Sequence, residues 1–113
     1  MNGISVYEQY FEAEITVYDY PRHGALVKLI ATSEEGMIKY DAFVTFFIHD
    51  DEEDFAVAYD VCGTEELYYA KGRRSKKREV ELLTKLRPAV DRIAENLGGK
   101  VFWDKPLGEA RRG

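Results

Sequence analysis

Cysteine, histidine and long apolar runs are scarce in this sequence of 113 residues. It has one cysteine and two histidines, and its longest apolar run, at 43–48, is interrupted by Thr45. A lone cysteine excludes a disulfide within the chain, and a run this short is far below the roughly 20 residues of a membrane span. The first ten residues contain neither a basic segment nor an apolar core, so we expect no secretory signal and a cytoplasmic location.

The motifs of common metal sites and active sites are also missing. His23, His49 and Cys62 have none of the spacings that zinc ligands adopt, and no glycine cluster precedes a helix as in a phosphate-binding loop. The acidic run at 50–54 lacks the glycine and the closing glutamate of an EF-hand loop. We therefore expect no metal, no cofactor and no catalytic residue, which favours a non-enzymatic protein.

Apolar and polar residues alternate through most of the first 61 positions. This is the period of a half-buried strand, and it predicts strands at 11–17, 25–31, 38–48 and 55–61, with a short fifth strand at 67–70. Proline, glycine and acidic residues predict turns at 20–24, 33–36 and 63–64, and a solvated loop at 49–54.

The amino-terminal segment is compatible with two structures. Ile4, Tyr7 and Phe11 recur at helical spacing and positions 5–8 match a capping box, which favours a two-turn helix. The alternative is a longer first strand.

Apolar residues recur every three or four positions through 76–97, which predicts an amphipathic helix. Ser75 is the expected N-cap, and the glycines at 98–99 are the expected stop. Pro88 lies inside this helix and predicts a kink or a junction of two helices. Residues 100–103 are expected to return as a last short strand.

Together these elements predict one α+β domain over residues 1–104, with a flexible tail over 105–113. Its core is a mostly antiparallel, meandering sheet of four to six strands, packed on one face by the carboxy-terminal helix. Large apolar side chains occupy both strand faces, so we expect curling of the sheet, the amino-terminal segment or another chain to cover the second face. Another chain would mean a homodimer or a protein partner, with Phe43 and Phe47 at the interface.

Charge is divided unevenly along the chain. Residues 1–70 hold 3 basic and 15 acidic side chains, a net charge of −12, whereas residues 71–113 hold 13 basic and 6 acidic, a net charge of +7. This fits an internally complementary molecule or two charged surfaces with different partners. Small acidic inhibitor and immunity proteins bind basic partners through such charge. The candidate acidic contacts with a protein partner are Glu12, Glu14, Asp51 and Glu53.

Six of the eight residues at 71–78 are cations, directly before the predicted helix. The helix dipole disfavours cations there, so we expect compensation by the chain's own acidic residues or by an external polyanion. A single-stranded nucleic acid would suit phosphate contacts with base stacking. The candidate contacts are Arg73, Arg74, Lys76, Lys77 and Arg78, with Tyr68 available for stacking.

Three functions follow, in order of preference. The first is a non-enzymatic cytosolic interaction module that binds a protein partner through charged and aromatic surface. The second is local binding of nucleic acid by the stretch at 71–78, and the third is a small-ligand or enzymatic pocket inside the curved sheet. Membrane binding is not expected.

Overall fold

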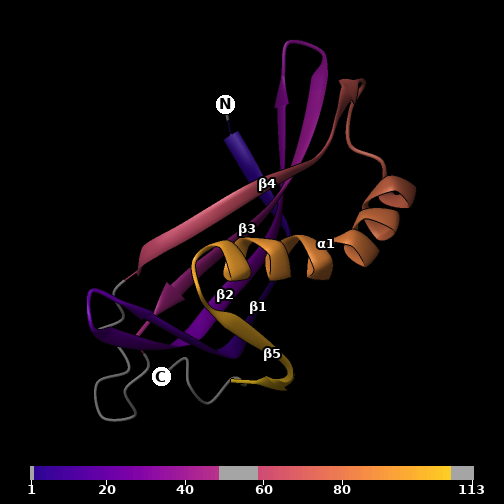
Figure 1. Cartoon of the computed structure of the whole chain (residues 1–113). Helices are drawn as coiled ribbons and strands as arrows, with labels where there is room; N and C mark the ends of the chain where they lie inside the picture. The colour runs from indigo at the N-terminus through magenta and orange to yellow at the C-terminus, as the bar shows by residue number, and fades with distance from the viewer. Residues whose placement is uncertain (1, 49–58, 108–113) are drawn as a thin grey trace.

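The computed structural model describes residues 2–48 and 59–107, which form one antiparallel sheet with one helix packed on it (Figure 1). Strands neighbour each other in the order β4-β3-β2-β1-β5, so the last strand lies beside the first. The predicted α+β fold, an antiparallel sheet with a carboxy-terminal helix, is confirmed. The elements are β1 (Asn2–Val17), β2 (Tyr20–Glu34), β3 (Met37–Phe47), β4 (Tyr59–Lys71), α1 (Lys76–Asn96) and β5 (Lys100–Pro106).

Two-residue turns join the first three strands. Tyr18 and Asp19 have φ of 52° and 68°, and Glu35 and Gly36 have φ of 53° and 80°. Positive φ at both central positions is the type I′ geometry, whose twist matches that of paired strands. The second turn lies within the predicted segment 33–36.

The predicted turn at 20–24 is wrong, because β2 begins at Tyr20 and continues through this segment. Among the described residues, the pairing of β2 with β3 begins at Gly24, so Pro21 has a strand neighbour only in β1. Because Pro21 lies beyond the described β2–β3 pairing, its lack of an N–H leaves no carbonyl of β3 without a hydrogen-bond donor. Gly24 makes room for Phe47, since a Cβ on this glycine would lie 2.4 Å from the Phe47 ring.

The amino-terminal segment belongs to β1, which decides between the two predicted alternatives. The register with β2 shifts between Ser5 and Tyr7, so Val6 is an extra residue in the strand. Because of this bulge, Ile4 and Tyr7 share one face of the sheet although they are three residues apart. A bulged strand has produced the spacing that suggested a helix.

β4 is continuous, so the predicted turn at 63–64 and the separate strand at 67–70 are wrong. Gly63 has a different role: a Cβ at this position would lie 2.5 Å from Cγ2 of Ile93. The glycine therefore permits close approach of α1 to the strand rather than a change in chain direction.

Some predicted segments fall partly or wholly outside the described residues. The predicted loop at 49–54 and most of the predicted strand at 55–61 lie there. β5 extends the strand expected at 100–103 into the segment assigned to the tail. The N–H of Leu107 then donates to the carbonyl of Tyr10 at 3.2 Å.

α1 begins and ends within one residue of its prediction. Ser75 Oγ accepts a hydrogen bond from the N–H of Arg78 at 3.2 Å, and Gly98 adopts a φ of 79° just after the helix. The chain forms one helix across Pro88, and the ribbon bends near its middle (Figure 1). A proline removes one backbone hydrogen bond from the preceding turn, which accounts for a bend without a break.

The apolar core lies between α1 and one face of the sheet, which we call the helix face. Val27, Leu29 and Val44 project from the central strands toward Leu86 and Val90 of the helix, and all five are buried. Each contributes roughly 1.5–3 kcal/mol through burial. This layer holds the helix on the sheet.

The other side of the sheet, which we call the open face, has no helix or strand above it among the described residues (Figure 1). Leu26 and Phe47 are nevertheless buried there, whereas Phe43 is partly exposed. The ring of Phe47 meets Tyr10 edge-on, with 5.8 Å between centroids, although β2 separates their strands. Side chains of the curled sheet therefore cover part of the open face and leave the rest exposed.

Candidate functional site

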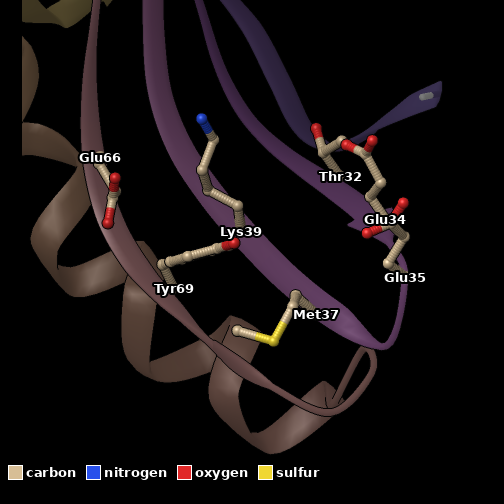
Figure 2. Close-up of a pocket in the computed structure, with 7 residues that line it drawn as sticks. All are labelled: Thr32, Glu34, Glu35, Met37, Lys39, Glu66 and Tyr69. Carbon is tan, nitrogen blue, oxygen red and sulfur yellow. The ribbon is translucent and has the colours of Figure 1, made fainter.

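The open face is hollowed near the turn between β2 and β3 (Figure 2). The volume of this hollow is about 450 Å³. Thr32, Lys39 and Tyr69 are register partners on β2, β3 and β4, so they form one row across it. The full lining is Thr32, Glu34, Glu35, Met37, Lys39, Glu66 and Tyr69.

Carboxylates dominate the charge of this region. Glu34, Glu35 and Glu66 line the hollow, and Lys39 is the single cation among the described lining residues. Asp41 follows Lys39 on the same face of β3. Within the described part of the chain, these five side chains form no hydrogen bond or ion pair. The oxygens of the four carboxylates are therefore available to a cationic ligand. We call the lining residues and Asp41 the acidic hollow.

Asp41 and Glu66 stand directly opposite each other on β3 and β4. Like charges in this arrangement destabilise a sheet. Burial raises the pKa of Asp41, the Lys39 ammonium opposes this shift, and the smaller effect of the Glu66 charge adds to it. A bound cation would relieve the repulsion. Charged residues whose arrangement destabilises the fold are typical of binding sites.

Asp41→Asn should raise the free energy of unfolding at neutral pH by about 0.2–1 kcal/mol, because it removes a partly buried charge that also stands opposite Glu66. Since the pKa of Asp41 is raised in the folded protein, the destabilisation is complete above that pKa. It is lost as the pH falls through that pKa toward the ordinary value of 3.8. Denaturant titrations at neutral and acidic pH would measure this difference. A variant less stable than the wild type at neutral pH would contradict it.

The groups in the acidic hollow suit a basic side chain. Carboxylate oxygens form charge-assisted hydrogen bonds with ammonium and guanidinium groups. The Tyr69 ring is 55% exposed and, with Met37, offers contact for the apolar stem of a lysine or arginine. No group of three histidine, cysteine or acidic side chains is placed to hold a metal ion in the described ranges.

Two cations of the basic stretch 71–78, Arg74 and Arg78, are bound to other described side chains. Arg74 donates from Nε and Nη2 to the carboxylate of Glu79, at 2.7 and 3.1 Å. Glu79 also accepts a hydrogen bond from the buried Tyr40 hydroxyl at 2.8 Å, which ties the start of α1 to β3. The Arg74 guanidinium lowers the pKa of Glu79 below its usual value.

Arg78 is the second internally bound cation. Its guanidinium carbon lies 4.2 Å from the centroid of the Tyr68 ring, and Nη1 lies 3.3 Å from Glu81 Oε1. Arg78 and Tyr68 are therefore in contact with each other. The candidate polyanion contacts that are exposed, with no hydrogen bond or ion pair to other described residues, are Arg73, Lys76 and Lys77.

The candidate protein contacts lie in different surroundings. Phe43 is half-buried on the open face, whereas Phe47 is only 2% exposed and packs inside the chain. Glu12 and Glu14 are exposed on β1 where it pairs with β5. Asp51 and Glu53 lie outside the described residues.

Glu34 and Glu35 lie in the acidic turn expected at 33–36, but no sequence motif marked Lys39, Asp41 and Glu66 as their neighbours. One signal was available: Lys39 and Asp41 alternate with the buried Ile38 and Tyr40, so they belong on the face away from the core. Which β4 residues stand beside them depends on strand register, which alternation does not specify.

The chain matches no protein-family model, no curated protein and no solved structure. Its function must therefore be inferred from the geometry of its own residues. Across the described residues, no helix has the length and apolarity needed to cross a membrane.

Proposed function

We propose that this protein is a non-enzymatic cytoplasmic binding module whose acidic hollow docks basic side chains of a protein partner. The observation that carries the proposal is that Asp41 and Glu66 stand opposite each other beside two further carboxylates, while Lys39 is the single cation among the described residues that line the hollow. The fold retains this arrangement at a cost in stability, which a cationic ligand would offset.

The surroundings of the acidic hollow support a protein as the ligand. Phe43 and Ile30 are partly exposed on the same face, so a partner seated on the carboxylates would also cover apolar surface. Interfaces combine such an apolar centre with a charged rim. The negative charge would also speed association with a basic partner and make it salt-dependent.

The proposal is tested by titrating a fluorescent arginine-rich peptide into the protein at low salt. The double variant Asp41→Asn, Glu66→Gln should bind at least about tenfold more weakly, because hydrogen bonds to charged groups contribute about 1.5–3 kcal/mol each. A matched control, Asp104→Asn with Glu95→Gln, removes the same charge from exposed sites on β5 and α1. It should bind less than about twofold more weakly.

Equal weakening by the two double variants would show attraction to overall charge and would contradict a defined site. A pull-down from the native host, at low and then moderate salt, would identify the partner. The proposal requires that this partner be lost on the Asp41→Asn, Glu66→Gln variant and kept on the control.

Nucleic-acid binding is the second candidate, supported by the exposed Arg73, Lys76 and Lys77 before and within the first turn of α1. Replacing Lys76 and Lys77 by alanine should leave thermal stability nearly unchanged, since exposed charges contribute about 0–1 kcal/mol. Each lost phosphate contact should reduce the slope of log affinity against log salt by about 0.7–0.9. Absence of oligonucleotide binding at about 50 mM salt would exclude this candidate.

A further inference from the structure

No described strand pairs with the outer edge of β1 over its amino-terminal half. In the part of the chain that the structure describes, β5 pairs with β1 between Phe11 and Glu14, and the N–H of Leu107 donates to the carbonyl of Tyr10. Among the described residues, positions 3–9 have no strand on this side. An exposed edge is a template for pairing with another strand, and charges or β-bulges commonly guard it. This one carries a single charged residue, Glu8, whereas the β4 edge carries several.

Exposed apolar side chains accompany this edge on the helix face. Ile4 is 48% exposed on β1, and Val80 and Leu83 of α1 are 60% and 37% exposed. A second hollow of about 280 Å³ lies between strand and helix, lined by Tyr7, Leu83, Leu86, Arg87 and Trp103. Ile4 shares the sheet face of Tyr7, and Val80 precedes Leu83 by about one helical turn. We call Ile4, Tyr7, Val80 and Leu83 the edge patch.

We infer that the edge patch and the β1 edge pair with a second copy of this chain, joining two sheets through antiparallel β1 strands. A twofold axis at Ser5 makes the edge complementary to itself. Val6 is the extra residue of the bulge, so Ile4 and Tyr7 occupy the pairing positions directly before and after Ser5. Ile4 of each copy would therefore stand opposite Tyr7 of the other. The same register places Gly3 opposite Glu8, so no like charges meet.

This register also fits the position of β5. The paired segment would run from Gly3 to Glu8 in both copies, and β5 approaches β1 only from Tyr10 onward. Both β5 strands would therefore lie beyond the ends of the shared segment. Each Ile4 would be placed beside the other copy's Tyr7, which lines the hollow with Leu83. A second copy would thus supply a strand and apolar side chains at an edge where the described residues place none.

The inference is tested first by light scattering of the full chain over a range of micromolar concentrations. The expected mass is twice the 13.0 kDa of one chain. Ile4→Lys and Leu83→Glu, both at exposed positions, should each weaken dimerisation at least about tenfold without changing the circular dichroism spectrum. Tyr20→Lys is the matched control, since Tyr20 is 65% exposed away from the edge patch, and it should leave dimerisation unchanged.

Cross-linking tests the register. In a Cys62→Ser background, Ser5→Cys should form a disulfide-linked dimer when diamide is added, because directly opposed strand residues have suitable Cα separations. A monomeric mass at every concentration would overturn the inference. So would a dimer that withstands Ile4→Lys and Leu83→Glu but is lost with Phe43→Asp, which would place the interface on the open face. The peptide titration of the acidic hollow does not depend on these outcomes.

Discussion

Glu79→Ala should lower the free energy of unfolding by about 2–4 kcal/mol at neutral pH. The Glu79 carboxylate is buried and joins Arg74 of the helix entry to Tyr40 of β3. Removing it leaves the Tyr40 hydroxyl without its acceptor and detaches the start of α1. The loss falls short of the largest values for buried ion pairs because the Arg74 side chain is 44% exposed and returns to water. Urea denaturation of both proteins would measure it.

Glu81→Ala is the matched control, since Glu81 pairs with Arg78 on the surface of the same helix turn. This change should cost about 0–1 kcal/mol. The pH dependence provides a second check. Because the pKa of Glu79 lies below its ordinary 4.5, its stabilisation is complete above that value and is lost as the pH falls through the lowered pKa. Equal losses for Glu79→Ala and Glu81→Ala would contradict the anchoring role.

Gly63→Ala should destabilise the fold by about 1–3 kcal/mol, the usual result of overpacking a core. The new Cβ would lie 2.5 Å from Cγ2 of Ile93, so α1 would have to move away from β4. Ile93→Leu removes the Cγ2 methyl group from Cβ and should relieve the clash. The double variant Gly63→Ala, Ile93→Leu should therefore be more stable than the sum of the two single effects predicts. Thr64→Ala, at the exposed neighbouring position, is the control. Additive effects in thermal melts would contradict close packing at Gly63.

Local signals explain why α1 was predictable. The N-cap at Ser75, the glycine after the helix and the apolar spacing between them all act within a few residues of one another. The alternation that marks β3 is equally local. Gly63 was misassigned because glycine serves both turns and close contacts, and only the position of α1 distinguishes these uses.

The acidic hollow was not predictable, because it depends on a single extra residue in β4. The register shift opposite Tyr40 and Asp41 leaves Leu67 unpaired, so Asp41 faces Glu66. Without this bulge Asp41 would face Leu67, and Glu66 would turn to the opposite side of the sheet. The sequence shows both carboxylates but contains no local mark of the bulge that brings them together.

The pairing of β1 with β5 has a consequence for the order in which the protein folds. The hairpins β1–β2 and β2–β3 close through two-residue turns, so they can form as soon as their own residues leave the ribosome. β5 reaches its place only after β4 and α1 have been synthesised, and it then joins strands at opposite ends of the described chain. In refolding of the whole chain, pairing Ala13 with Val101 closes a much longer loop than either hairpin does, so these contacts should form after the rate-limiting step. Substitutions at Val101 should accelerate unfolding and leave the refolding rate almost unchanged, as stopped-flow kinetics would show.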